Sequence, residues 1–518
     1  MTSVPQLIDR AARRFADRVA VTDGDRALTF AGTNSRANRL AHGLLTLSSA
    51  PGARVSLLMN NRLEYVECDF AVAKAGKVRV SINPRLVDHE RRHILADAGV
   101  ETLIFDSAFA AFAMDAARDL PDLKHLIAIG SDVTGALPYE ELLLGASDST
   151  PSIRRLPTDP NYIMYTSGTS GKPKGAVASD AGRIAATVNM LLDEISPGPG
   201  DGMLHVGSMC HGSGSKVLAY FLRGARNVTL AKFEAETFFD TVRENGITGT
   251  FVVPTMIGML LHAAADRNVD TGGLRDVTYG GAPITPTRLA EALDRFGNIF
   301  VQVYGSCEAP HPVMVLGRDD HAAALNAGGD RLTTVGREAT LVQTRLVTDN
   351  GADAAPGGKG ELWVRGPNVM TGYWGDPAAT GLVFDNGWYK TGDVVVRDEL
   401  GFNYIVDRVR DVVISGGLNV YPAEVEAAIS RHPAVLDVAV IGVPDERWGE
   451  SVKAVVVLKP SATTDESQLL AFCADNLAGY KKPRSIDFVA SLPVGSTGKV
   501  LKRELAQRYW QGRQRRVN

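Results

Sequence analysis

The sequence is short of cysteine, of excess positive charge and of long apolar runs. Its four cysteines, Cys68, Cys210, Cys307 and Cys473, are far apart and include no Cys-x-x-Cys pair. A disulfide framework or a zinc site is therefore not expected, and a reducing compartment fits best. The formal net charge of −4 argues against nucleic-acid binding, because there is no basic excess to neutralise phosphates.

No segment approaches the roughly 20 consecutive apolar residues of a membrane span. The N-terminus carries Asp9 and Arg10 where a signal peptide needs an apolar run. We therefore expect a soluble, cytoplasmic protein with neither nucleic acid nor membrane among its partners.

Strand-like and helix-like segments alternate through the first 300 residues. Buried strands are predicted at 55–59, 78–82 and 102–105, with helices between them at 64–75 and 90–98. The same alternation continues to a predicted strand at 299–303. Such βαβ spacing predicts an α/β fold with parallel sheets covered on both faces. Residues 328–366 are richer in glycine and strand-like segments, which predicts a small β-rich subdomain.

The pattern changes after residue 408. A strand at 412–415, a helix that begins at Pro422 and strands at 435–441 and 451–458 predict an α+β unit of about a hundred residues. A chain of 518 residues is also expected to form more than one domain. We expect a large N-terminal domain over 1–408, a hinge at 409–411 and a small C-terminal domain over 412–518.

The segment 165–175 reads Tyr-Thr-Ser-Gly-Thr-Ser-Gly-Lys-Pro-Lys-Gly. Glycines allow backbone N–H groups to approach an anion, hydroxyls add donors, and lysines add charge. This composition predicts a phosphate-binding loop; the alternative is a flexible surface loop. The Walker A pattern does not fit, because Pro173 stands where that pattern would open a helix.

This loop resembles the phosphate-binding signature of the adenylate-forming superfamily, which includes acyl-CoA synthetases, peptide-synthetase adenylation domains and luciferases. Five later stretches resemble its motifs in the expected order over nearly the whole chain. They are Gly280-Gly281-Ala282-Pro283, Tyr304-Gly305-Ser306-Cys307-Glu308, Tyr389-Lys390-Thr391-Gly392-Asp393 with Asp407-Arg408 after it, the segment 416–424, and Gly495-Ser496-Thr497-Gly498-Lys499.

The resemblance implies a site for ATP and Mg²⁺. Asp393 would accept hydrogen bonds from both ribose hydroxyls, and Arg408 would add a contact to the ribose or a phosphate. Glu308 with Thr169 would bind the metal, since a hard cation prefers oxygen ligands. The phosphate loop would contribute Thr166, Ser167, Gly168, Thr169 and Lys174, and the adenine and phosphate walls would contribute Gly281, Ala282, Pro283, Tyr304, Gly305, Ser306 and Cys307.

The resemblance also implies a pocket for a carboxylic acid, lined by His211, Gly212, Ser213, Gly214, Lys216, Val253 and Gly280. His211 would lie beside the reacting carboxylate; the alternative is a buried, hydrogen-bonded histidine. For Lys216 the alternative is a side chain that reaches solvent. An amino-acid substrate is disfavoured, because the segment 205–211 has no Asp to pair with an amine.

Lys499 resembles the catalytic lysine of the family, which contacts the acid and the α-phosphate, where two anions must approach each other. The implied catalytic set is Lys499, Thr166, Glu308 and His211. By resemblance the C-terminal domain is mobile and turns about Arg410. Lys499 would serve the first half-reaction, and the turn of Gly416, Gly417, Leu418 and Asn419 would face the thiol in the second.

The sequence thus predicts an ATP-dependent carboxylic acid–CoA ligase, a monomer or homodimer, that forms an acyl-adenylate and then a thioester with coenzyme A. Cys307, Asp180 and Leu418 replace a Thr, a His and a Glu that are frequent in the family, which leaves the acid and the acceptor open. The alternatives are an enzyme that loads a carrier protein, an enzyme that activates nitrite to diazotise an aryl amine, and an inactive nucleotide-binding regulator. Intact Lys499, Glu308 and Asp393 argue against the regulator.

Overall fold

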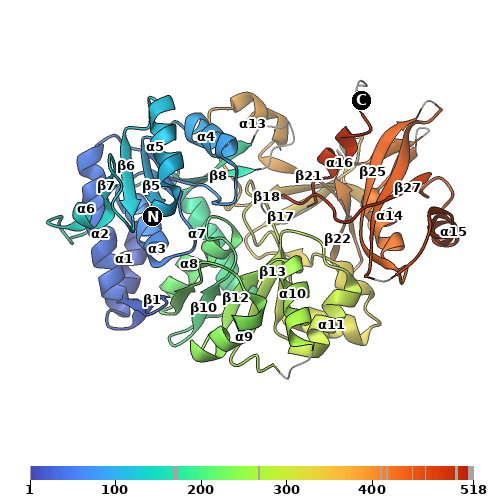
Figure 1. Ribbon diagram of the computed structural model, residues 1–518, viewed down its shortest axis with the longest axis horizontal. Helices are drawn as coiled ribbons and strands as arrows, with labels where there is room; N and C mark the ends of the chain where they lie inside the picture. The colour runs from blue at the N-terminus through green and yellow to red at the C-terminus, as the bar shows by residue number, and fades with distance from the viewer. Residues whose placement is uncertain are drawn as a thin grey trace. The chain divides into compact units, whose positions relative to one another are not determined.

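The computed structural model describes residues 2–166, 173–265, 269–408, 411–415, 418–445, 447–460, 462–495 and 500–510. The chain divides into two units (Figure 1), one of Met1–Gln343 with Val364–Tyr389, the other of Thr344–Trp363 with Lys390–Asn518. The predicted hinge falls within the second unit, and its residues Val409 and Arg410 lie outside the described residues. The predicted division into 1–408 and 412–518 stays a prediction.

One sheet of the first unit has eight strands in the order β19-β9-β8-β4-β3-β5-β6-β7. Strands β3 to β8 pair in parallel, whereas β9 and β19 run antiparallel to their neighbours. The strands predicted at 55–59, 78–82 and 102–105 correspond to β3, β4 and β5. The sheet consists of β3 (Arg54–Leu58), β4 (Val78–Ser81), β5 (Thr102–Asp106), β6 (His125–Ile129), β7 (Leu137–Pro138), β8 (Pro160–Thr166), β9 (Lys174–Ser179) and β19 (Gly372–Tyr373).

The other sheet of this unit has nine strands in the order β16-β15-β14-β13-β12-β10-β11-β1-β2. Its central strands are parallel, so the carboxyl ends of β13 and β14 lie at the same edge. The sheet consists of β1 (Val19–Asp23), β2 (Arg26–Thr29), β10 (Gly202–His205), β11 (Arg226–Thr229), β12 (Gly249–Val252), β13 (Asp276–Gly280), β14 (Phe300–Tyr304), β15 (Met314–Leu316) and β16 (Arg337–Glu338).

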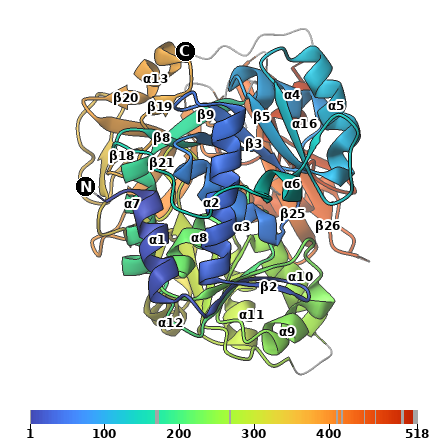
Figure 2. The ribbon, with the colours of Figure 1, turned by 90° about the vertical axis from the view of Figure 1, so that its left-hand side faces the viewer.

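Four helices share one core with strands of both sheets: α1 (Val4–Arg14), α2 (Phe30–Leu47), α3 (Leu63–Lys74) and α8 (Gly212–Leu222). Figure 2 shows α1 and α2 side by side. Every residue of α3 is buried. The ring of Phe221 lies 4.5 Å from that of Phe30 and 4.8 Å from that of Phe70, centroid to centroid. This shared core holds α8, which carries several predicted acid-pocket residues, against α1 and strands β10 and β11 of the second sheet.

The other helices of the first unit are α4 (Asp88–Asp97), α5 (Ala110–Asp119), α6 (Tyr139–Leu143), α7 (Asp180–Asn189), α9 (Ala235–Glu244), α10 (Pro254–Ala264), α11 (Pro286–Phe296), α12 (Arg318–Asn326) and α13 (Pro377–Val383).

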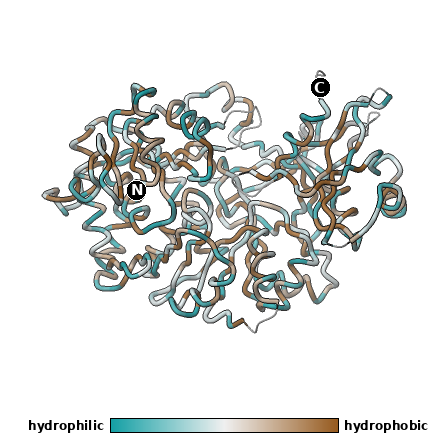
Figure 3. The backbone as a smooth tube through the Cα atoms, viewed as in Figure 1, coloured by the Kyte–Doolittle hydropathy of each residue, from teal (hydrophilic) through white to brown (hydrophobic). Residues whose placement is uncertain are grey.

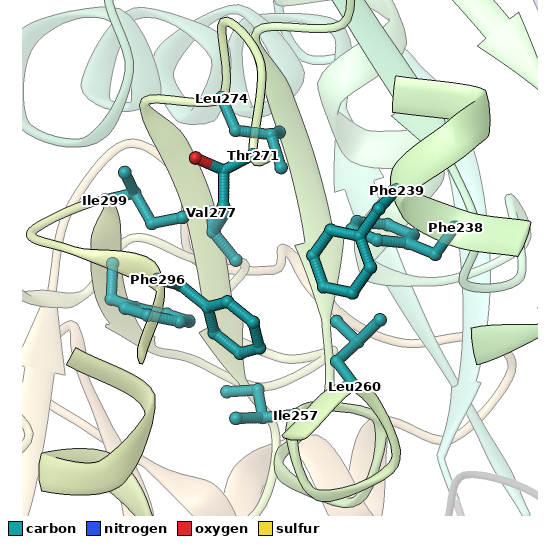
Figure 4. Close-up of a pocket in the computed structure, with 10 residues that line it drawn as sticks. Phe238, Phe239, Ile257, Leu260, Thr271, Leu274, Val277, Phe296 and Ile299 are labelled. Atoms are coloured by element: carbon teal, nitrogen blue, oxygen red, sulfur yellow. The ribbon is translucent and has the colours of Figure 1, made fainter. Parts of the chain in front are cut away.

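Figure 4 shows a pocket at α9, α10, α11 and β13, lined by the side chains of Phe238, Phe239, Ile257, Leu260, Thr271, Leu274, Val277, Phe296, Ile299 and Phe300. None of these lining residues is charged. The pocket therefore belongs to the hydrophobic core and has no charged group to bind a carboxylate or a phosphate.

The second unit is α+β. Its main sheet has the order β24-β23-β26-β25, with β27 beside β26, and Figure 3 shows hydrophobic residues along β25 and β26. Its elements are β23 (Val413–Ser415), β24 (Leu418–Val420), α14 (Pro422–Ile429), β25 (Val435–Asp445), β26 (Gly449–Leu458), α15 (Glu466–Asn476), β27 (Ser485–Phe488) and α16 (Lys502–Gln507).

The smaller β-rich region consists of β17 (Gln343–Val347), β18 (Lys359–Arg365), β20 (Phe384–Asp385), β21 (Trp388–Arg397) and β22 (Asn403–Arg408).

These elements confirm the predicted fold class, an α/β fold with parallel sheets, a small β-rich region and an α+β C-terminal part. Across the described ranges, none of the helices combines the length and the apolar character that a membrane crossing requires.

Candidate functional site

The predicted phosphate loop joins the two strands of a hairpin. Strand β8 pairs in parallel with the buried strand β4, and β9 turns back antiparallel, so that Thr166 and Lys174 lie directly opposite each other. The loop between them contains Ser167, Gly168 and Thr169, which lie outside the described residues. The hairpin thus places a hydroxyl and an ammonium group at the two ends of the predicted loop.

A tyrosine links this hairpin to Glu308. Strand β19 pairs with β9, with Tyr373 opposite Ala176. The Nζ atom of Lys174 lies 5.4 Å from the centroid of the Tyr373 ring, and the Tyr373 hydroxyl donates a hydrogen bond of 3.0 Å to Glu308 Oε1. Burial first, and then the charge of Glu308, raise the pKa of Tyr373, so the phenol stays protonated and can donate.

The Glu308 carboxylate fits the predicted magnesium ligand. Its Oε1 accepts the bond from Tyr373, and its Oε2 accepts no hydrogen bond from a described residue. The backbone is also held, because the Met370 N–H donates to the Glu308 carbonyl oxygen at 2.7 Å. Within the described ranges no cluster of three or more His, Cys, Asp or Glu residues could hold a metal alone. A cation at Glu308 would therefore take further oxygens from a bound phosphate.

Glycine is required at the predicted nucleotide walls. Gly280 ends β13 and pairs with Val303 of β14, and a Cβ atom on Gly280 would overlap the Val303 carbonyl oxygen. Gly281 has φ of +81°, in the left-handed region. A Cβ on Gly305 would lie 2.6 Å from the backbone nitrogen of His311. The two turns thus sit at the carboxyl ends of adjacent parallel strands, where α/β sheets bind ligands.

The turn after β14 is closed by its own hydrogen bonds. The Ala309 N–H donates to the Ser306 hydroxyl at 3.0 Å, and the Ser306 N–H donates to the Ala309 carbonyl oxygen at 2.9 Å. Tyr304 and Cys307 are half-buried, as is Ala282 in the other turn, whereas Pro283 is exposed. Cys307 remains a thiol, as do the other three cysteines.

The predicted acid pocket begins at His211, directly before α8. The His211 Nε2 atom lies 3.4 Å from Asn83 Nδ2. A Cβ on Gly212 would lie 2.7 Å from the Phe251 ring, and a Cβ on Gly214 would overlap the Met209 carbonyl oxygen. These two glycines therefore allow Phe251 and the preceding loop to lie directly against the first turn of α8.

His311 joins this region to the turn after β14. Its ring stacks on Phe251, with the centroids 5.6 Å apart and an interplanar angle of 27°. Its Nε2 lies 3.1 Å from the Ser215 hydroxyl. The sequence prediction missed His311, Phe251 and Asn83, as well as Tyr373. The Ser213 hydroxyl forms a hydrogen bond of 2.9 Å with His205 Nδ1. Val253 is half-buried just before α10.

Lys216 does not reach solvent, so that alternative is wrong. The residue is 1% exposed and forms an ion pair with Glu194, which is 5% exposed. Burial lowers the pKa of Lys216 well below its usual range, although the charge of Asp276 opposes this shift. The sequence analysis also missed Glu194, which is the last residue of a π-helical turn, η2 (Met190–Glu194).

Asp180 has a structural role. It is buried, and its carboxylate accepts hydrogen bonds of 2.9 Å from the Val4 N–H, from Arg155 Nε and from Asn161 Nδ2. Its carboxylate thus ties the start of α1 to β8. The departure from the family pattern at this position carries no information about the acceptor.

The second unit holds the predicted ribose contact. Asp393 is buried on β21, opposite Arg408 on β22, and its N–H donates to the Thr391 hydroxyl at 3.0 Å. Asp407 Oδ2 accepts a bond of 3.0 Å from the Ala423 N–H. The remaining predicted residues lie outside the described residues, either entirely (Arg410, Gly416, Gly417 and Lys499) or with their side chains (Arg408, Leu418 and Asn419).

Both the N-terminal and the C-terminal part of the chain match known protein families. Residues 8–374 match the family described as AMP-binding enzyme, and residues 424–499 match the AMP-binding enzyme C-terminal domain. A feruloyl-CoA synthase from an Amycolatopsis species is 38% identical over 504 residues, covering 96% of this chain and 98% of that protein. The medium/long-chain-fatty-acid–CoA ligase FadD8 of Mycobacterium tuberculosis is 34% identical, covering 99% and 91%. Among solved structures, the amide bond synthetase McbA from Marinactinospora thermotolerans has a TM-score of 0.89 at 30% identity, covering 98% of this chain and 100% of that one.

Proposed function

Because the chain belongs to the AMP-binding enzyme family, within the adenylate-forming superfamily, we propose that it is an ATP-dependent carboxylic acid–CoA ligase acting on an aromatic acid. As an AMP-forming ligase of this family, it uses ATP and coenzyme A. The proposed acid class follows the 38% identity to a feruloyl-CoA synthase over nearly the full length of both chains.

The observation that carries the proposal is the contact chain from Lys174 through Tyr373 to Glu308, directly beside the hairpin pair Thr166 and Lys174. It brings a cation, a hydroxyl and a carboxylate to one predicted phosphate site. Lys174 and Thr166 would hold the β- and γ-phosphates, and Glu308 would hold Mg²⁺, which neutralises phosphate charge when bound.

In the first half-reaction the acid carboxylate attacks the α-phosphorus of ATP, forms the acyl–phosphate bond and releases pyrophosphate. We assign to Lys499 the stabilisation of the charge that builds up as the two anions meet. Asp393 would accept hydrogen bonds from the ribose hydroxyls. In the second half-reaction the thiolate of coenzyme A attacks the acyl carbon, and AMP leaves with the electron pair of the broken C–O bond.

The test is a panel of acids in a pyrophosphate-release assay, with hydroxycinnamates, benzoates, medium and long fatty acids, and nitrite, each with the purified full chain, ATP and Mg²⁺. We expect release with at least one aromatic acid, and AMP release plus thioester formation when coenzyme A is added. Glu308→Gln should abolish release, while Glu399→Gln, on an exposed turn, is the matched control.

Three results would contradict the proposal. Release with fatty acids but no aromatic acid would reject the acid class. Adenylate transfer to a carrier protein but not to coenzyme A would reject the acceptor. Nitrite-dependent AMP release that requires an aryl amine would replace the ligase by a diazotising enzyme. Absence of pyrophosphate release with every acid and with nitrite would, in addition, reject the ligase activity itself.

A further inference from the structure

The buried ion pair of Lys216 and Glu194 has more hydrogen-bonding capacity than the described protein uses. Apart from the contact between them, Lys216 Nζ and both Glu194 oxygens make no hydrogen bond within the described ranges. Buried polar atoms are normally satisfied, because each unmet group loses its hydration without compensation. A donor and an acceptor side by side, both unsatisfied, indicate a place for a polar group that comes from outside the chain.

The backbone around the pair is also unusual. Helix α7 changes at Met190 into the π-helical turn η2, and Glu194 is its last residue. π-Helical turns are rare and occur frequently at functional sites. A regular α-helix would place residue 194 on a different face, so the π turn is what directs this carboxylate toward Lys216.

The pair lies on the side of α8 that faces the proposed acid pocket. Residues 212 and 216 share one helix face, and a helical side chain leans over the preceding turn. Gly212 faces Phe251, and Phe251 stacks on His311. Burial first, and then the charge of Lys216, lower the pKa of His311.

The distance along the helix fits an aromatic acid. His211 would lie beside the reacting carboxylate, and the rise from residue 211 to residue 216 is about 7.5 Å. This is close to the length of a benzoic acid from its carboxylate to a substituent on the opposite ring carbon. The pair therefore lies where the far end of such an acid would be.

We propose that Lys216 and Glu194 bind a neutral hydroxyl group at the far end of the acid, so that the substrates are ring-hydroxylated aromatic acids. A hydroxyl accepts a hydrogen bond from Lys216 Nζ and donates one to a Glu194 oxygen. A second carboxylate at this end would be repelled by Glu194, because Lys216 is already paired. An ammonium group would likewise be repelled by Lys216, and an apolar end would leave both groups without a further hydrogen-bond partner. The inference rests on the proposed acid activation and adds its specificity.

The experiment compares matched acids that differ at one ring position, in the pyrophosphate-release assay with the full-length enzyme. The acids are 4-hydroxycinnamate, cinnamate, 4-aminocinnamate and 4-carboxycinnamate, and the corresponding benzoates. We expect kcat/KM for the hydroxylated acid to exceed that for the unsubstituted acid about a hundredfold or more, because the unsubstituted acid leaves a buried charge pair unsatisfied.

The double variant Lys216→Met/Glu194→Leu removes both charges and keeps an apolar core. We expect it to lower the hydroxyl preference to about tenfold or less while retaining activity on cinnamate. Glu194→Gln, which keeps the shape and still accepts a hydrogen bond, should give an intermediate preference and is available if the double variant fails to fold. The matched control is Lys74→Met/Asp9→Leu, a buried pair with 2.5 Å between Nζ and Oδ1 in the same unit, which should leave the preference unchanged.

Two outcomes overturn this inference alone: wild-type enzyme that uses hydroxylated and unsubstituted acids equally, or variants at residues 194 and 216 that keep the full preference. A preference for the 4-carboxy or 4-amino acid would also overturn it, because it would reassign the end group. If no acid of either series releases pyrophosphate, the proposed function fails and this inference fails with it.

Discussion

Replacing Tyr373 by phenylalanine removes one hydroxyl and keeps the ring that Lys174 contacts. In the native protein that hydroxyl donates a 3.0 Å hydrogen bond to Glu308 Oε1, while Lys174 Nζ lies 5.4 Å from the ring centroid. Tyr373→Phe therefore separates the orientation of the carboxylate from the position of the lysine. If Glu308 holds the metal, its carboxylate loses the bond that fixes its rotamer.

A hydrogen bond to a charged group contributes about 1.5–3 kcal/mol. Tyr373 and Glu308 are both half-buried, so water can replace part of this interaction, and we take the lower end of that range. About 1.5 kcal/mol corresponds to roughly tenfold in an equilibrium constant. The Mg²⁺ concentration for half-maximal pyrophosphate release should therefore rise about tenfold, with kcat at saturating Mg²⁺ reduced less than about twofold.

The assay is a Mg²⁺ titration of pyrophosphate release, with calorimetric titration of ATP at low and high Mg²⁺ as a readout that needs no turnover. Tyr373→Leu should add the loss of the contact with Lys174, a further ~0.5–1 kcal/mol in ATP binding. An unchanged Mg²⁺ dependence in Tyr373→Phe would refute the reasoning. A fall in kcat that saturating Mg²⁺ does not restore would assign the hydroxyl a different role.

Three further predictions concern other parts of the chain. Gly280→Ala should lower the free energy of unfolding by about 1–3 kcal/mol through overlap with the Val303 carbonyl oxygen, whereas Gly381→Ala, with open space around it, should not; thermal denaturation of both tests this. Burial alone would raise the pKa of Asp69, but Arg183 and Arg79 lower it, so its stabilisation is present above the unfolded pKa of about 4 and is lost as the pH falls through the folded value. Asp69→Asn should therefore cost about 3–5 kcal/mol at pH 7 and clearly less at pH 3, and an equal cost in urea unfolding at both pH values would contradict this. Lys499→Ala should slow pyrophosphate release about a hundredfold or more but keep thiol attack on supplied acyl-adenylate, and Arg410→Pro should do the reverse; equal loss of both half-reactions would reject domain rotation.

The α/β alternation could be predicted because it is a local property. A buried parallel strand is a short apolar run, and the strands predicted at 55–59 and 78–82 match β3 and β4 to within a residue at each end. The resemblance to the superfamily also identified the glycines at 280 and 305. The structure explains both, since a Cβ atom at either position would overlap a backbone atom of the adjacent strand or turn. Both signals depend on neighbours that the fold class itself supplies.

The contacts that complete the site depend on pairs far apart in the sequence. Tyr373 reaches Glu308 across 65 residues, and His311 reaches Ser215 across 96. An isolated tyrosine or histidine has no periodicity and no turn chemistry to mark it. The direction of Glu194 depends on a π-helical turn, which the helical periodicity of a sequence does not reveal. Such residues can be found only once the sheet order is known.

Asp180 shows how a sequence departure can mislead when its partners are unknown. Read against the family pattern, an Asp in place of a frequent His suggests altered chemistry at the acceptor side. In the structure its three hydrogen bonds come from the backbone of Val4, from Arg155 and from Asn161, all of which hold the fold. A buried carboxylate whose two oxygens both accept hydrogen bonds from the scaffold is explained by its structural role. Lys216 is the opposite case, because the sequence alone is compatible with either a surface lysine or a pocket residue. Its burial beside Glu194, with no further hydrogen bond to a described residue, is the basis of its proposed role in choosing the acid.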